Sequence, residues 1–501
     1  MTTRAPLRVL RIVVASALAA FCLWRGIAAA SAYFTSADAY AYIAAWRSAA
    51  RSAPGERLAV FCGNADCLSP VDRSRILAVS WERAPSPLAA VDGKSDLKSV
   101  DCVISSYWHP RQAAERLENC GFSVVSTNEY TKTWRRGGTT VPEPSGPGSA
   151  VSPYREVASL VAELALYLVC CRFLLCLKPG EGGWAALVSS VVVAVVLGSV
   201  ALSHPLLAPN GLGTYGGKAK LLFESGSIPG EFLASAGGMA LQPSYPPALT
   251  ALAYVHFALS GGCSDRLVQM IVVFAMAILS FAMLRKASTP WLAVPVALFC
   301  LSPVAARMAS GFYAEPFAAL ALLLGWRIAT EGRLAAGSLV MGLAGLFRPE
   351  AGIVAAFFAA GSASCGFRRK LLAVAAAASP SLAWFAASMA LGYGAVPDWS
   401  LGAGPRLGQA AIAMLVEAKA FGLFVMPIAA LALLVRPRLE MRLLGGAARA
   451  LFPAVLLMAA IPFACAFYAG PHAAWMMENT IPRLVWYVFA IPLFELARGR
   501  E

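Results

Sequence analysis

Long apolar runs separated by short polar connections fill most of the chain after residue 155. A helix needs roughly 20 apolar residues to cross a bilayer. Runs of about that size lie near 156–177, 183–203, 246–262, 267–284, 291–306, 314–330, 335–364, 371–392, 411–435, 449–469 and 480–497. With a first run from about Val9 to Ala30, the pattern predicts a mostly α, polytopic membrane protein of about 12 spans. Arg348-Pro349-Glu350 interrupts the 335–364 run, which is either one broken span or two short helices.

The segment 35–153 has a different pattern, with shorter apolar runs and many polar residues. Ser36 to Ala50 reads as an amphipathic helix, and Pro110 to Asn119 as a second helix. Strand-like runs lie at Leu58–Cys62, Ile76–Trp81, Cys102–Tyr107, Phe122–Ser126 and Tyr130–Trp134. These elements predict a small α/β domain, which a Gly-, Pro- and Ser-rich linker, Gly137 to Pro153, joins to the membrane part 154–501.

Basic residues before the first apolar run, among them Arg4 and Arg8, favour a cytoplasmic N-terminus. The segment 1–34 is then a membrane anchor or a cleaved signal, and both place the small domain outside the cytoplasm. Counting spans puts the polar stretch His204–Pro247 on the same outer side. Arg285 and Lys286 fall outside by the same count, against the charge rule, so the middle of this topology is loosely fixed. The expected location is therefore a membrane that the chain crosses several times.

Composition supports the membrane class. Hydrophobic residues make up 58% of the 501 residues and charged residues 14%, and the net charge is +14. Soluble chains carry about 25% charged residues. The excess of Lys and Arg fits loop ends and anionic headgroups. No basic patch with interleaved aromatic residues indicates a nucleic-acid partner, and no motif indicates a cofactor.

Four of the 12 cysteines, Cys62, Cys67, Cys102 and Cys120, lie in the small domain. An even number in an exported segment predicts two disulfides, whose pairing the sequence does not fix. A zinc site is the alternative, but the spacing suits it poorly.

The stretch His204–Pro247 is the longest polar interruption among the apolar runs. It carries Lys218 and Lys220, followed by Glu224 and Glu231. The lysines are either part of an amphipathic anchor at the membrane surface or a clamp for a lipid phosphate.

Ionisable residues inside apolar runs are costly, and they mark either functional sites or internal ion pairs. Glu315, Arg348, Glu350 and Arg483 occupy such positions. Sugar transfer from a lipid-linked phosphate needs a carboxylate to take the acceptor's proton and cations to offset charge on the leaving phosphate. The candidate bases are Glu315, Glu224 and Glu231. The candidate cations are Lys218, Lys220, Arg348 and Arg483.

Several short motifs occur in a characteristic order. They are Gly217-Lys218-Ala219-Lys220 with Gly226, Ser244-Tyr245-Pro246-Pro247, Phe312-Tyr313-Ala314-Glu315, Phe347-Arg348-Pro349-Glu350-Ala351-Gly352, and Arg483 opening a late span. In this order the chain resembles the GT-C-type integral membrane glycosyltransferases of bacteria, the group that includes the lipid A aminoarabinose transferase and protein O-mannosyltransferases. The resemblance covers roughly 155–497. It implies a polyprenyl-phosphate-linked sugar donor, a glycan, lipid or protein acceptor, and substrate contacts from Tyr245, Tyr313 and Glu350.

The chain departs from that group at one place. The acid that precedes the Lys-Ala-Lys helix in the group has no counterpart here, because Asn210 to Thr214 contains no carboxylate. Either a later glutamate is the base or the chain is an inactive relative that acts as a scaffold. A transporter or lipid-handling protein is the third reading, although transporters usually show matching broken helices in two halves and the sequence shows one break.

Overall fold

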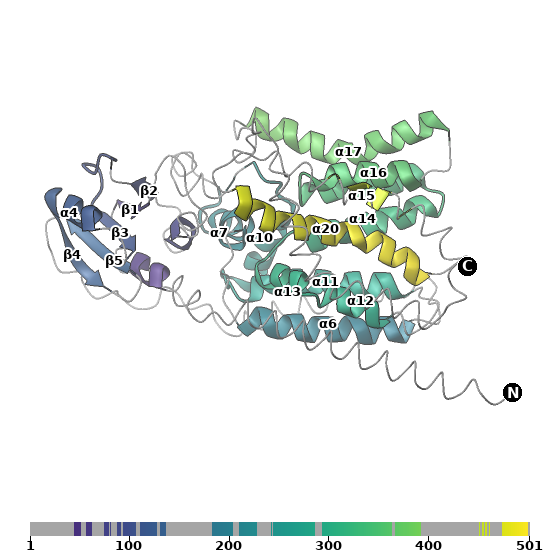
Figure 1. Ribbon diagram of the computed structural model, residues 1–501, viewed down its shortest axis with the longest axis horizontal. Coiled ribbons are helices and arrows are strands. Elements are labelled where there is room, and N and C mark those ends of the chain that lie inside the picture. Colours follow the sequence, from purple (N-terminus) through teal and green to yellow (C-terminus); the bar gives the residue numbers. More distant parts are fainter. Residues whose placement is uncertain are drawn as a thin grey trace. The chain divides into compact units, whose positions relative to one another are not determined.

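The computed structural model consists of two compact units, each built from separated parts of the chain (Figure 1). One unit contains 34–160 and 204–268, and the other contains 1–33, 161–203 and 269–501. The structure describes residues 45–51, 57–62, 75–79, 81, 88–91, 94–106, 111–127, 131–136, 183–203, 210–227, 242, 244–285, 293–362, 366–391, 450, 453–454, 456–457, 460 and 473–498. We call the unit of 34–160 and 204–268 the outer unit, after the side of the membrane predicted for it from the sequence, and the other the helical unit. The division differs from the sequence prediction, because the polar loop groups with the small domain.

A five-stranded sheet forms the core of the small domain. Its strands are β1 (Leu58–Phe61), β2 (Leu88–Val91), β3 (Cys102–Ser106), β4 (Phe122–Thr127) and β5 (Thr131–Arg136), in the order β2-β1-β3-β5-β4. β1 pairs in parallel with both β2 and β3, whereas β5 is antiparallel to β3 and β4. Helix α4 (Arg111–Asn119) connects β3 to β4, and Gly121, whose φ of 81° suits glycine, lies in the turn after the helix.

The predicted strand at Ile76–Trp81 is wrong. Residues 75–79 and Trp81 are helical, and Ile76 to Val79 are fully buried. A short apolar run that is buried on every side has no periodicity to separate strand from helix. The prediction also missed β2, because Leu-Ala-Ala-Val contains two residues that are depleted in strands. The first predicted helix is described only from residue 45.

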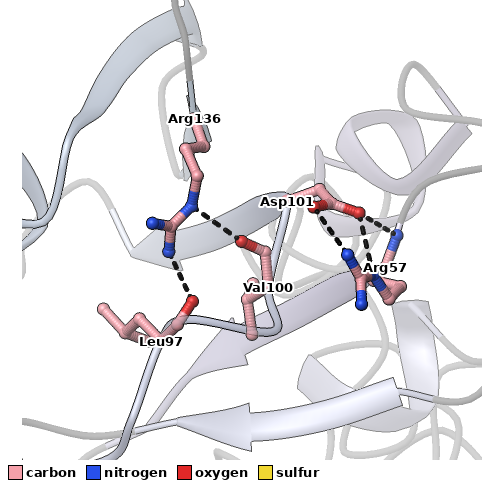
Figure 2. Close-up of polar contacts among 5 residues, drawn as sticks. All are labelled: Arg57, Leu97, Val100, Asp101 and Arg136. Atoms are coloured by element: carbon pink, nitrogen blue, oxygen red, sulfur yellow. Dashed lines mark hydrogen bonds and ion pairs between the residues drawn. The ribbon is translucent and has the colours of Figure 1, made fainter.

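Polar contacts at one end of strands β1, β3 and β5 brace the connection between β2 and β3 (Figure 2). Arg136 donates hydrogen bonds to the carbonyls of Leu97 and Val100. The Arg57 guanidinium lies 3.1 Å from the Asp101 carboxylate, and this hydrogen-bonded pair lowers the pKa of Asp101 below its ordinary value of 3.8. Both side chains of the pair are exposed.

The cysteines of the small domain do not support the two-disulfide prediction. Two bridges among four cysteines would require one bridge between two of Cys62, Cys102 and Cys120, and none joins these three. The register of β1 and β3 explains why Cys62 and Cys102 are far apart. Leu58 is opposite Cys102, so Cys62 lies four residues farther along the neighbouring strand, about 13 Å away. A disulfide needs Cα atoms within about 7 Å. Cys67 lies outside the described residues.

The outer unit also contains three helices from the loop and the run that follows it. They are the π-helix η1 (Asn210–Tyr215), α7 (Gly216–Ser225) and α10 (Ala248–Ser260). η1 runs directly into α7, and α7 packs on α10, where the Phe223 and Phe257 rings meet edge to face. Gly226 and Gly261 end the two helices in the left-handed conformation.

The helical unit contains the following helices. They are α6 (Gly183–Ser203), α11 (Met270–Leu284) preceded by η2 (Leu267–Gln269), α12 (Ala293–Cys300), α13 (Pro303–Ser310), α14 (Glu315–Thr330), α15 (Leu334–Gly342), η4 (Leu343–Leu346), α16 (Ala351–Ser362), α17 (Phe367–Ala390) and α20 (Ala473–Arg498). α6 packs on α11, and α14 packs on both α15 and α20 (Figure 1). α17 covers α15 and α16.

Among the described residues, three helices are long and apolar enough to cross a membrane: Gly183–Leu202, Leu267–Leu284 and Phe367–Ala390. A fourth is added if the bent pair α13 and α14 counts as one span. The predicted run 335–364 is two short helices, α15 and α16, and α10 is also short. The predicted spans near Val9 to Ala30, 156–177 and 411–435 lie outside the described residues, as does most of 449–469.

Glycines allow the short helices to approach one another closely. A Cβ on Gly337 of α15 would lie 2.3 Å from the Ala329 backbone nitrogen of α14. A Cβ on Gly325 would lie equally close to the Met341 nitrogen. Small residues at helix contacts are common in membrane proteins, where packing drives association.

Candidate functional site: a buried carboxylate between two guanidiniums

Glu315 lies at a sharp break in the helical unit. α13 and α14 meet at an angle of 114°, and Glu315 is the first residue of α14. Its neighbour Pro316 fits the first turn of a helix, and a carboxylate there is stabilised by the helix dipole. The Glu315 side chain has no solvent exposure. The break therefore brings an acidic side chain into the interior.

The backbone is strained just before Glu315. Phe312 has φ of 55°, a left-handed conformation that a bulky residue rarely adopts, and the residue is fully buried. Strain of this kind costs about 1–3 kcal/mol and persists only where the surroundings enforce it. It occurs three residues from the buried acid.

Two guanidiniums converge on one oxygen of Glu315. Arg483 Nη1 lies 2.9 Å from Glu315 Oε1, and Arg348 Nη1 lies 3.6 Å from the same atom. Both arginine side chains are almost completely buried. Arg348 comes from the turn between η4 and α16, and Arg483 follows Pro482 inside α20. Three elements distant in sequence thus supply the three charges.

The other oxygen of Glu315 has a different environment. Oε2 is buried and has no hydrogen-bond partner among the described residues. An unsatisfied carboxylate oxygen in a protein interior is expensive, and it marks a place where a ligand's hydroxyl or a water can donate. Oε1 is held by cations, whereas Oε2 has no donor within the described part of the chain.

Glu350 completes the charge balance of this cluster. Its carboxylate pairs with Arg348, and its side chain is 15% exposed. Two carboxylates and two guanidiniums sum to zero when all are ionised. Buried charges are tolerated in such balanced, hydrogen-bonded sets. We call Glu315, Arg348, Glu350 and Arg483 the buried charge cluster.

Aromatic rings border the cluster. The Arg483 guanidinium lies 4.4 Å from the centre of the Tyr313 ring, within the range of cation–π attraction. Phe317 and Phe347 stack with ring centres 5.1 Å apart, and they lie two residues after Glu315 and one residue before Arg348 in the sequence. Tyr313 was predicted as a substrate contact, and it holds Arg483 in position here.

The loop lysines have separate environments in the outer unit. Lys218 is 5% exposed, and its Nζ donates to the carbonyls of Gln242 at 3.2 Å and Tyr245 at 3.3 Å. Gln242 has φ of 50°, and its side-chain oxygen accepts from Thr214. Lys218 therefore fastens the turn before α10 to the start of α7.

Lys220 faces the small domain. Its Nζ donates to the carbonyl of Trp81, lies 5.4 Å from the centre of the Trp81 ring, and lies 3.6 Å from Glu224. Tyr245 meets Tyr215 edge to face at 6.4 Å.

The structure brings together five predicted site residues, the buried charge cluster and Tyr313. It groups Lys218, Lys220, Glu224 and Tyr245 in the outer unit, and Glu231 lies outside the described residues. No set of three or more His, Cys, Asp or Glu side chains suited to a metal ion occurs within the described part of the chain.

Comparison with known proteins gives no match: no family model, no curated protein and no solved structure matches this chain. The chemistry of the site therefore rests on its own residues.

Sequence reasoning missed two features of the site. The left-handed Phe312 gives no signal in sequence, because its conformation depends on the break around it. The second is Glu495 of α20, a partly buried carboxylate that accepts a hydrogen bond from Trp326 Nε1 at 2.7 Å. An acid inside the last apolar run was a visible signal.

Proposed function

We propose that this chain is a membrane glycosyltransferase that moves a sugar from a polyprenyl-phosphate-linked donor to a hydroxyl acceptor. The observation that carries the proposal is the state of Glu315, whose Oε1 lies between two guanidiniums while Oε2 is buried without a partner among the described residues. A base and an anion-binding pair are thus adjacent, as this transfer requires.

In the proposed reaction Glu315 Oε2 accepts the proton of the acceptor hydroxyl. The hydroxyl oxygen attacks the anomeric carbon of the donor sugar, and the bond from that carbon to the phosphate oxygen breaks. The phosphate leaves with the bonding electron pair, and the configuration at the anomeric carbon inverts. The Arg348 and Arg483 guanidiniums offset the charge on the departing phosphate, for which arginine is well suited.

The remaining parts of the proposal follow from the sequence. The chain would cross a bacterial inner membrane about 12 times. The lipid tail of the donor would stay in the bilayer, and the acceptor would be a glycan, lipid or protein on the outer side. Three apolar helices of spanning length support the membrane setting.

The test is sugar transfer by the full-length protein in lipid vesicles, with a panel of polyprenyl-phosphate sugars as donors. Glu315→Gln should lower the transfer rate by roughly 100-fold or more, since general base catalysis contributes about that much. Glu315→Asp keeps the charge and shows whether the loss comes from chemistry or from folding. The matched control is Glu331→Gln at the other end of α14, where the carboxylate is 42% exposed and pairs with Arg327. Wild-type transfer by Glu315→Gln would exclude this site.

A transporter is the second candidate, because the described residues contain a helix break between α13 and α14 in addition to the one predicted at Arg348-Pro349-Glu350. The α13–α14 break supplies Glu315, and the turn before α16 supplies Arg348. Broken helices that meet at buried charges are typical of transporters. These breaks are consecutive in the chain, however, and transporter repeats place them in matching halves. Solute uptake into vesicles without sugar transfer would favour this candidate, and lipid-phosphate binding without turnover would favour an inactive scaffold.

A further inference from the structure

The small domain and the loop helix α7 meet around one buried indole, that of Trp81. Trp81 is 3% exposed, and two cations lie over its ring: Lys220 at 5.4 Å and Arg47 at 5.8 Å. Each cation also has a carboxylate. Arg47 pairs with Asp265, in the turn after α10, and Lys220 pairs with Glu224. We call these five residues the Trp81 junction.

The junction is charge-balanced and draws on separate segments of the chain. Arg47 and Trp81 come from the small domain, Lys220 and Glu224 from α7, and Asp265 from the segment after α10. The Arg47 and Lys220 side chains are 14% and 12% exposed, so their attraction to the ring is only weakly screened by solvent. A partly desolvated cation–π pair is stronger than an exposed one.

Close backbone packing supports the same contact. A Cβ on Gly213 of η1 would lie 2.5 Å from a Leu77 methyl carbon. A Cβ on Gly216, the first residue of α7, would lie 3.4 Å from the Trp81 ring. The glycines of the loop allow η1 and α7 to pack directly on the helical residues 75–79 and Trp81.

We propose that the small domain is a positioning domain for the loop, and that Trp81 is the residue through which it acts. Lys220 and Glu224 are then positioning residues that hold α7, and neither is a ligand for phosphate. Lys218, on the same helix, is held instead by the carbonyls of Gln242 and Tyr245. This role explains why a small α/β domain precedes the membrane part, and it stands whether or not the chain transfers a sugar.

The test is amide hydrogen exchange of the full-length protein in lipid nanodiscs, with Lys220→Met as the main variant. Met keeps the apolar stem and removes the charge. Lys220→Met should speed exchange of residues 75–79, on the far side of the junction, by roughly tenfold, the size expected for one desolvated cation–π pair. Trp81→Ala should speed exchange of α7, and Trp81→Phe, which keeps a ring, should restore part of the protection.

Two controls separate this role from general destabilisation. Arg57→Ala removes an exposed ion pair elsewhere in the small domain and should leave α7 at the wild-type rate. Lys218→Met should loosen the turn at Tyr245 and leave 75–79 unchanged. If Lys220→Met leaves residues 75–79 fully protected, the proposal is wrong. If Trp81→Ala also speeds exchange in β3 and β5, that variant destabilises the small domain as a whole. The Lys220→Met result then decides whether the proposal holds, because Lys220 lies outside the small domain.

Discussion

At the scale of single residues, environment separates charged side chains that look alike in sequence. Glu315 and Glu331 bound the same helix, but one is fully buried between two guanidiniums and the other is a solvated ion pair. Lys218 and Lys220 are two positions apart, and one holds backbone carbonyls while the other lies over an indole. Their chemistry follows from burial and partners, which the sequence pattern alone does not supply.

The exposed Arg57–Asp101 pair predicts a small, pH-dependent contribution to the stability of the small domain. Because the pair lowers the pKa of Asp101 below 3.8, its stabilisation is complete above that pH and is lost as the pH falls through the lower, folded value. Asp101→Asn should reduce the free energy of unfolding by about 0.2–1 kcal/mol at pH 7, and less at high salt. Denaturant unfolding at pH 7 and pH 3 measures the difference, which should be smaller at pH 3. A larger difference at pH 3 would contradict the assignment.

At the scale of elements, helix breaks and close crossings build the site. The α13–α14 break orients Glu315, and the glycine contacts between α14 and α15 place the following turn where Arg348 can reach it. These contacts leave no space for a side chain. The spacing of elements is therefore part of the geometry of the buried charge cluster.

Gly337→Ala should lower the stability of the helical unit by about 1–3 kcal/mol, because the added methyl would overlap the α14 backbone. Thermal unfolding in detergent measures the change. Gly366→Ala is the matched control, since Gly366 has an ordinary φ and nothing within 4 Å of an added Cβ. Equal effects of the two substitutions would show that the close crossing does not matter.

Cys263 provides a chemical report on the outer unit. Burial, with a smaller contribution from the Glu224 carboxylate, raises the pKa of this thiol to about 12. If Trp81→Ala opens the junction, the pKa should fall toward its ordinary value of 9.0, and the thiolate fraction at pH 8 should rise by up to roughly a thousandfold. Alkylation of Cys263, followed by site-resolved mass spectrometry, measures it. Unchanged labelling in Trp81→Ala would show that the thiol is buried independently of the junction.

Much of this organisation was predictable from patterns, and the failures have physical causes. The apolar runs located α6, α11, α14 and α17, and the interruption at Arg348-Pro349-Glu350 located a helix break. The run Ile76 to Trp81 misled because full burial removes periodicity. The convergence of Glu315, Arg348 and Arg483 follows from helix crossings, and the junction at Trp81 follows from tertiary packing, so neither has a local signal.

At the scale of the whole molecule, two units carry different kinds of chemistry. The helical unit contains the buried charge cluster. The outer unit contains the loop lysines, of which Lys220 contacts Trp81 of the small domain and Lys218 contacts the carbonyls of Gln242 and Tyr245. A lipid-linked donor suits an apolar unit with an internal anion-binding pair. The transfer rate of Glu315 variants distinguishes a catalytic centre from a structural ion-pair network.

The most direct measurement compares binding and transfer in the same preparations of wild-type protein and Glu315→Gln. Removing the carboxylate leaves the Arg348 and Arg483 guanidiniums with one anion fewer, so a polyprenyl phosphate should bind at least as tightly to Glu315→Gln as to wild type. Sugar transfer by that variant should nevertheless fall by roughly 100-fold or more. Retained binding with lost transfer would support Glu315 as the base. Transfer at the wild-type rate by Glu315→Gln would contradict the account.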